Sequence, residues 1–174
     1  MLDDLFMDGL RLVVCGTAAG RASALVGHYY AGPGNKFWRT LAEVGLTPRR
    51  LEPSEYRLLP DYGIGLTDLV KAQFGGDHEI TFALSGREIL HAKIERHQPR
   101  VFCFNGKRAA KEFYGVDEVS FGMQPALIGR TRVFVAPSTS GAANGSWDHE
   151  AWRQLAGHVL GGQTTFERPT QARE

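Results

Sequence analysis

The sequence predicts an α/β protein: a three-layer α/β/α sandwich around a mostly parallel central sheet of four to five strands. Short apolar runs, the first at residues 10–15 and the last at 131–135, alternate with segments of helical periodicity. That alternation is typical of a parallel sheet with helices on both faces. Two runs lead directly into loops of small residues, at 16–20 and 137–145. Such loops lie at the carboxyl ends of strands, where an open α/β sheet forms its binding crevice.

The expected strands are buried apolar runs bounded by turn residues. They are residues 10–15, 64–70, 101–104 and 131–135. The last is expected to pair with residues 126–128 in a hairpin that turns at Gly129 and Arg130.

The helices are expected where capping residues precede apolar positions at helical spacing. Asn35 is a suitable N-cap for the first helix. Ser85 and Glu88 form a capping-box pattern for the second, which Pro99 ends. The remaining two are a short helix containing Ala109, Ala110 and Phe113, and a closing helix at residues 147–160.

A single domain at residues 10–160 is expected, because 174 residues are enough for one hydrophobic core. Residues 1–9 are expected to form a loose N-terminal lead-in. Residues 161–174 are polar and rich in Gly at their start, which predicts a flexible tail.

Composition excludes several function classes. The formal net charge is +1, so any attraction to phosphate must be local. Cys15 and Cys103 lie in apolar runs typical of buried thiols and are too few for a four-cysteine metal site. We expect no metal and no cofactor. No stretch is apolar enough to cross a membrane and no secretory pattern is present, so we expect a cytoplasmic monomer, nucleoid-associated in a prokaryote.

Two ligand classes fit a crevice lined by small-residue loops. A dinucleotide would need a G-x-G-x-x-G turn, which the loop at residues 16–20 does not supply. An oxidoreductase with a nucleotide cofactor is therefore the weaker alternative. A nucleic-acid base fits better, because Tyr29 and Tyr30 offer aromatic rings while backbone N–H groups can bind the edge of a base and a phosphate.

Three motifs, in order and with intact spacing, carry a family resemblance. GTAAG at residues 16–20 precedes AGPGNKFW at 31–38, similar to a G-I-N-P-G loop followed by an N-R-F-W helix start. PSTSGAA at 137–143 is similar to N-P-S-G-L-S, and GIGLTDLV at 63–70 falls at the expected third strand end. Across residues 10–160, this pattern resembles the mismatch-specific, thymine-DNA-glycosylase-like branch of the uracil-DNA glycosylase superfamily.

The resemblance implies a monofunctional DNA-repair glycosylase that flips uracil out of DNA, G·U mismatches included, and hydrolyses its N-glycosidic bond. Its partner would be double-stranded DNA containing uracil or a mismatch, with single-stranded DNA left open. Tyr30 would stack on the flipped base, although it could instead be a lid packed on the core. The implied base-binding residues are Gly16, Thr17, Ala18, Ser23 and Tyr30. Those implied for sugar and phosphate are Ser138 and Ser140, and those implied to enter the duplex are Gly141, Ala142, Ala143 and Asn144.

Two positions depart from the family pattern. Ala18 stands where the family has Asn or Asp to position the attacking water, and residues 141–144 lack the usual Leu or Arg wedge. Asp68 is the candidate catalytic residue, because a carboxylate at an apolar strand end is costly unless it serves a site. A helix-capping role for Asp68 is the alternative. Ala18 also leaves open a second function, a lesion-recognition module that binds damaged DNA without chemistry.

Overall fold

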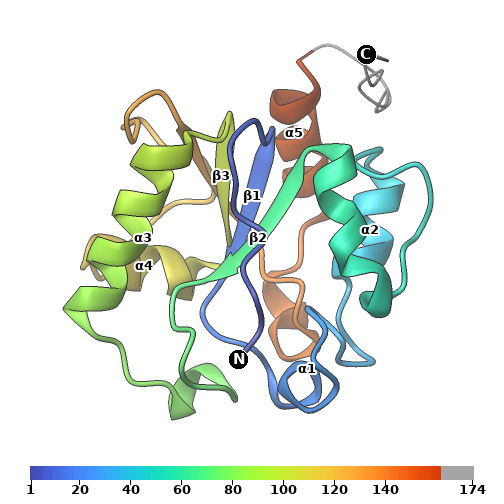
Figure 1. Cartoon of the computed structure of the whole chain (residues 1–174), viewed down its shortest axis with the longest axis horizontal. Coiled ribbons are helices and arrows are strands. Elements are labelled where there is room, and N and C mark those ends of the chain that lie inside the picture. The colour runs from blue at the N-terminus through green and yellow to red at the C-terminus, as the bar shows by residue number, and fades with distance from the viewer. Residues whose placement is uncertain (162–174) are drawn as a thin grey trace, which may run out of the picture.

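Five strands form one sheet in the order β2-β1-β3-β5-β4, in a computed structural model that describes residues 1–161 (Figure 1). The first four in that order run parallel, and β4 pairs antiparallel with β5. Their bounds are β1 Leu12–Gly16, β2 Ile64–Asp68, β3 Val101–Asn105, β4 Gly122–Met123 and β5 Arg132–Ala136. The predicted tail lies outside the described residues except for Gly161.

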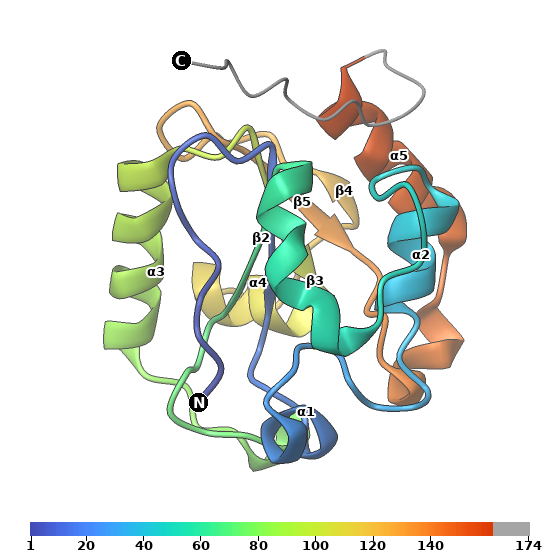
Figure 2. The same cartoon turned by 45° about the vertical axis from the view of Figure 1, so that its right-hand side comes forward.

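Helices cover both faces of the sheet, which confirms the predicted α/β/α layers (Figures 1 and 2). On one face, Val13 and Cys15 of β1 pack with α3 (Leu84–His97) and α4 (Lys107–Tyr114). On the other face, Leu12 and Val14 pack with the remaining large elements. These are α2 (Phe37–Glu43), the 3-10 helix η1 (Pro53–Tyr62) and α5 (His149–Leu160). Burial on both faces explains why the strands are continuous apolar runs.

Two tryptophans fasten the loops at the carboxyl ends of the strands to the core. Trp38 on α2 donates a hydrogen bond to the carbonyl of Tyr29 at 3.1 Å. Trp152 on α5 donates to the carbonyl of Pro137 at 2.9 Å. Both indole rings are buried. The core therefore fixes the backbone on either side of the crevice.

The N-terminal segment differs from the expected loose lead-in. Leu2 and Leu5 are buried, and Leu5 exchanges two backbone hydrogen bonds of 2.9 Å with Leu66 of β2. Gly65 makes this approach possible, because a β-carbon there would collide with the Leu5 carbonyl oxygen. Residues 1–9 thus pack on the domain.

The helix boundaries differ in part from the sequence expectations. The N-cap of α2 is Lys36 and not Asn35, although Asn35 Oδ1 accepts a hydrogen bond from the Phe37 backbone at 3.0 Å. The capping-box expectation at Ser85 is wrong, since α3 begins at Leu84 with Ala83 as its N-cap. Neither η1 nor the short helix α1 (Arg21–Val26) was expected, because neither has a clear apolar period.

The expected hairpin is present only at its turn. Ile128 and Thr131 exchange backbone hydrogen bonds, but residues 126–128 are not the strand that pairs with β5. That strand is β4, and its pairing continues to Gln124, which donates to the Val133 carbonyl at 2.8 Å. Pro125 follows and has no N–H to extend the ladder.

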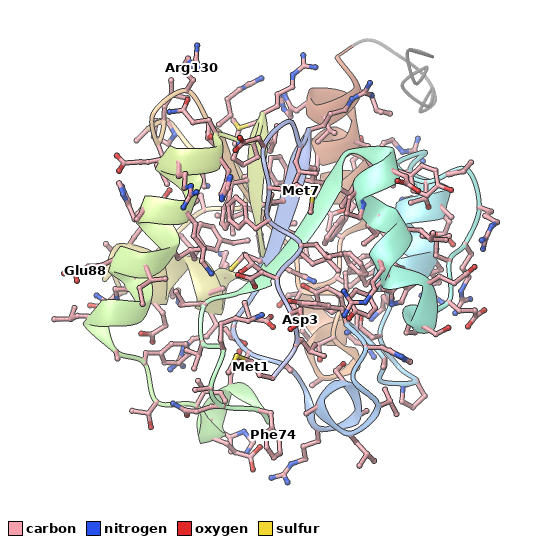
Figure 3. All side chains as sticks on the ribbon, in the orientation of Figure 1. Met1, Asp3, Met7, Phe74, Glu88 and Arg130 are labelled. Carbon is pink, nitrogen blue, oxygen red and sulfur yellow. The ribbon has the colours of Figure 1, made fainter. Side chains whose placement is uncertain are left out.

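The two ends of the sheet carry different loops. Arg130, in the hairpin turn, marks the end where the parallel strands begin, and Phe74 lies at the opposite end (Figure 3). Phe74 forms an isolated bridge with Ala19, which places it beside the loop that follows β1. Among residues 1–161, no helix combines the length and apolar character needed to cross a bilayer.

Candidate active site

A cleft of about 760 Å³ lies at the carboxyl ends of the parallel strands. The loops that follow β1, β3 and β5 line it, together with the end of β2 and the segment 75–78. Every site residue expected from the sequence lines this cleft except Asn144. They are Gly16, Thr17, Ala18, Ser23, Tyr30, Asp68, Ser138, Ser140, Gly141, Ala142 and Ala143.

The loop after β1 is hydrogen-bonded through its backbone carbonyl groups to the segment after β2. Those of Gly16, Thr17 and Ala19 accept backbone hydrogen bonds of 2.8 to 2.9 Å from the segment after β2. Ser23, on α1, is buried and its hydroxyl accepts from the Ala31 backbone at 3.0 Å, which closes the long loop on itself. The backbone lining this side of the cleft is therefore fixed in place.

Tyr30 lies between the core and the cleft. Its ring packs on Phe37 with centroids 4.1 Å apart, and the side chain also lines the cleft. Burial, together with the charge of Asp68, raises the pKa of its hydroxyl. That hydroxyl is buried and makes no hydrogen bond of ordinary geometry within residues 1–161, although the nearby Asn105 side chain offsets part of the rise in its pKa. The backbone φ of 52° is uncommon for a residue with a side chain, and such conformations cluster at functional sites.

Asn105, the last residue of β3, holds the loop after β5. Its side-chain amide donates to Thr139 Oγ1 at 2.9 Å, and its amide oxygen accepts from the Thr139 backbone at 3.0 Å. Ser138 Oγ and Ser140 Oγ accept from backbone N–H groups within the same loop, at 3.2 and 3.3 Å. Asn105 was not among the expected site residues, although its place at a strand end is a sequence signal for such a role.

Residues Gly141–Ser146 form a short 3-10 helix, η3, at the rim of the cleft. Ala142 and Asn144 are exposed. Asn144 contacts the ammonium of Lys36, which also lies 5.2 Å from the centre of the Trp147 ring. Asn144 therefore belongs to this outer contact and does not line the cleft.

Asp68 is the last residue of β2, and its side chain is 5% exposed. Burial raises the pKa of its carboxyl to about 6, and the nearby charge of Lys71 opposes that rise. The Lys71 ammonium lies 3.7 Å from Asp68 Oδ2, so the carboxylate has a cationic partner that the sequence did not reveal. The helix-capping alternative is wrong, because the next helical element, η2 (Asp77–Glu79), begins nine positions later.

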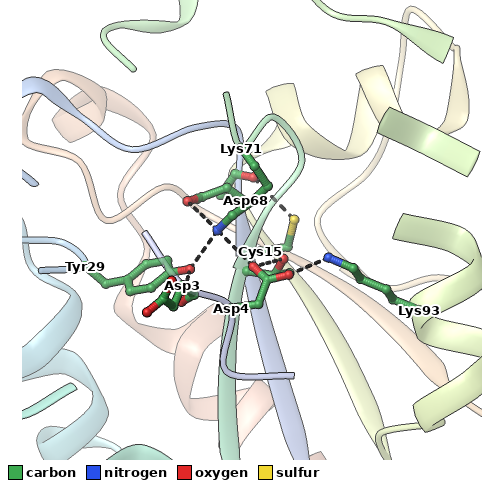
Figure 4. A network of polar contacts seen from close by, with 9 residues as sticks. Asp3, Asp4, Cys15, Tyr29, Asp68, Lys71 and Lys93 are labelled. Carbon is green, nitrogen blue, oxygen red and sulfur yellow. Dashed lines mark hydrogen bonds and ion pairs between the residues drawn. The ribbon is translucent and has the colours of Figure 1, made fainter. Parts of the chain in front are cut away.

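A polar network connects Asp68 to the N-terminal segment (Figure 4). Lys71 donates to Tyr29 Oη at 2.9 Å and pairs with Asp4 at 2.8 Å. Asp4 also pairs with Lys93 at 2.5 Å and accepts from the Thr67 hydroxyl at 2.9 Å. This network leaves no local sequence pattern, because its members come from separate parts of the chain.

Basic groups line one wall of the cleft. Lys107 and Arg108 begin α4 there, and the Lys107 ammonium lies 4.3 Å from the centre of the exposed Phe121 ring. Arg108 is partly neutralised by Glu112, 3.1 Å away. Across residues 1–161, no group of three His, Cys, Asp or Glu side chains is placed to hold a metal ion.

These features define an α/β protein with a ligand cleft at the carboxyl edge of its sheet, where a buried carboxylate and an aromatic ring meet. Residues 4–156 match the family model of the uracil DNA glycosylase superfamily, and the chain belongs to that superfamily. Its fold is similar to the solution NMR structure of a candidate uracil DNA glycosylase from Methanosarcina acetivorans. The TM-score is 0.56 at 21% identity, over 91% of this chain and 96% of that one. Family membership supports a DNA glycosylase role, with DNA as the partner.

Proposed function

We propose that this protein is a monofunctional uracil-DNA glycosylase that hydrolyses the N-glycosidic bond of uracil, G·U mismatches included. It leaves an abasic site in the DNA. The observation that carries the proposal is the pairing of Asp68, buried at the floor of the cleft, with Tyr30 beside it. Glycosidic cleavage needs a negative charge near the sugar and a pocket for a planar base, and these two side chains supply both.

The chemistry follows from the charges that develop during cleavage. As the bond between C1′ and uracil N1 breaks, the sugar becomes positive and the electron pair leaves with the base. Ionised Asp68 stabilises the sugar and orients a water molecule, whose oxygen bonds to C1′ while its proton passes to the carboxylate. A carboxyl with a pKa of about 6 is largely ionised at neutral pH and is still basic enough to take that proton.

The base is stacked on Tyr30 and bordered by the backbone of Gly16, Thr17 and Ala18. Since Phe37 supports the Tyr30 ring from the core, the ring is held in place for stacking. Ser23 lies near the edge of the base, and Ser138 and Ser140 contact sugar and phosphate. The Ser138 and Ser140 hydroxyls accept from backbone groups, so their protons are available for donation.

A preference for weakly paired uracil is supported by the small side chains of η3. Ala142 and Ala143 cannot fill the space that a flipped base leaves in the stack. Flipping then depends on pairs that are already weak, because a mismatched or unpaired base costs less to extrude. Uracil opposite guanine and uracil in single strands are therefore the proposed substrates.

The second candidate function is recognition of damaged DNA without catalysis. Ala18 favours it, because a methyl group cannot position an attacking water. Asp68 favours cleavage, since a binding module gains nothing from a buried carboxylate of raised pKa. We therefore rank the glycosylase first.

The test is single-turnover cleavage of oligonucleotides that hold one uracil, with abasic sites revealed by alkali. Asp68→Asn should lower the rate by at least about a hundredfold, while DNA binding is kept. Asp61→Asn, at an exposed carboxylate of η1, is the matched control and should cleave normally. Uracil-specific binding without abasic sites would instead establish the recognition module. Normal cleavage by Asp68→Asn would remove Asp68 from the mechanism.

A further inference from the structure

The ammonium group of Lys71 lies near two carboxylates, those of Asp4 and Asp68, at unequal distances. Lys71 Nζ lies 2.8 Å from Asp4 Oδ1 but 3.7 Å from Asp68 Oδ2, and it donates to Tyr29 Oη at 2.9 Å. Its side chain is 23% exposed, so solvent screens these charges only in part. Lys71 therefore lies closer to Asp4, and the two carboxylates compete for its ammonium group (Figure 4).

Asp4 does not depend on Lys71 for its position. The bridge between Leu5 and Leu66 fixes the adjacent backbone, and the Thr67 hydroxyl and Lys93 contact the carboxylate from other directions. Burial raises the pKa of Asp4, but hydrogen bonds from Lys71 and Lys93 outweigh it and hold the pKa below its usual value. Asp4 is therefore a fixed negative charge beside the site.

We propose that Lys71 is a positioning residue that keeps the Asp68 carboxyl ionised and oriented on the floor of the cleft, and that Asp4 limits this effect by competing for Lys71. The proposal rests on the proposed catalytic role of Asp68. It makes the N-terminal segment, whose Leu2 also lines the cleft, part of the active site.

The other groups that face Asp68 carry no charge at neutral pH. Burial raises the pKa of the Cys15 thiol on β1, and likewise the pKa values of the Tyr29 and Tyr30 hydroxyls in the long loop. Within the part of the chain that the structure describes, the charges acting on Asp68 are therefore those of Lys71 and Asp4. Ionisation of Asp68 should respond to each of them separately.

The two charges push the ionisation of Asp68 in opposite directions. Lys71→Met removes the cation and should raise the titration midpoint of Asp68 by about one pH unit or more. Asp4→Asn removes a repelling charge and frees Lys71 to approach Asp68, so the midpoint should fall. Lys93→Met is the comparison variant: it removes a lysine partner of Asp4 that makes no contact with Asp68, so it should move the midpoint less than Lys71→Met does. Lys71→Arg retains the charge and should stay closest to wild type in midpoint.

Two measurements test the proposal. The first follows the carboxyl ¹³C resonance of Asp68 against pH in full-length protein, assigned by its loss in Asp68→Asn; the wild-type midpoint should be about 6. The second is the pH profile of single-turnover uracil cleavage, whose acid limb should move with the NMR midpoint in each variant. Thermal melting confirms that each variant is folded.

The outcomes separate this proposal from the proposed function. Midpoints that move up in Lys71→Met and down in Asp4→Asn support it, even in a protein that does not cleave uracil. Shifts in the same direction, or no shift relative to Lys93→Met, overturn it. If NMR midpoints move as expected while the acid limb of cleavage stays in place, Asp68 is tuned but is not the catalytic base.

Discussion

Gly16 and Asp68 are Cα partners in the parallel strands β1 and β2, and the Asp68 carboxylate lies against the bare backbone of Gly16. A β-carbon at Gly16 would be 2.9 Å from Asp68 Oδ1 and 3.4 Å from Tyr30 Oη. Any side chain at this position must therefore displace the Asp68 carboxylate, the group to which we assign the chemistry.

Gly16→Ala should accordingly impair catalysis more than folding. Displacement of a catalytic group by about 1 Å can cost about a hundredfold in rate, and we expect a loss of at least about tenfold in single-turnover cleavage. Gly20→Ala is the control in the same loop, because a β-carbon there meets nothing within 4 Å. A wild-type rate in Gly16→Ala would show that the reaction does not need Asp68 where it lies.

Asp68 should destabilise the folded protein at neutral pH. Its pKa is about 6 when folded and near the ordinary 3.8 when unfolded, so the folded state holds the proton more tightly. This contribution vanishes well below about pH 4, where both states are protonated, and opposes folding increasingly as the pH rises to about 6. Asp68→Asn should thus raise the free energy of unfolding by about 3 kcal/mol at about pH 8 and much less at about pH 4.

Urea denaturation at both pH values measures this difference, with Asp61→Asn as the exposed control. A gain in stability that accompanies a loss of cleavage would identify Asp68 as a group retained for function. Destabilisation by Asp68→Asn at neutral pH would mean that its ion pair with Lys71 outweighs the cost of burial.

Tyr30 variants should separate stacking from packing. Tyr30→Phe keeps the ring and removes a buried hydroxyl that makes no hydrogen bond of ordinary geometry in residues 1–161, so stability and rate should be retained. Tyr30→Ala loses a base stack worth about 1–3 kcal/mol. It also loses the contact with Phe37, so stability should fall as well, and cleavage is compared per folded molecule. Normal activity per folded molecule in Tyr30→Ala would leave the ring with a packing role alone.

A larger side chain at the rim should assist base flipping in duplex DNA. Ala142→Leu adds an apolar group on η3 that can occupy the space left by the flipped base. We expect faster cleavage of uracil in double strands and little change in single strands. Ala126→Leu, at an exposed position before the hairpin turn, controls for general hydrophobicity. Equal changes on both substrates would show that η3 does not enter the duplex.

The layers of the fold were predictable because burial on both faces leaves a strong pattern. The runs around Val13, Phe102 and Phe134 are continuously apolar, and each leads into a turn or a loop of small residues. The same logic placed the candidate site, since loops at the carboxyl ends of parallel strands must meet at one edge. That is why the cleft gathers nearly all of the expected residues.

The partners of Asp68 were not predictable from local pattern. Lys71 is near in sequence, but nothing in a turn segment indicates which way a lysine points. Asp4 and Lys93 come from segments that pattern analysis treats as a loose end and a solvated helix face. Their meeting depends on the bridge between Leu5 and Leu66, a long-range pairing of only one residue that leaves no periodic signal.

That single bridge also covers part of an exposed edge of the sheet. β2 is the outermost parallel strand, and an uncovered strand edge is a template on which a second chain can add. The backbone of Leu5 hydrogen-bonds to the N–H and C=O groups of Leu66, in the middle of β2, so these groups are not available to pair with another strand. A large side chain at Gly65 would expel this cover. Such a substitution should therefore expose the β2 edge and move Asp4 away from Lys71 in a single step.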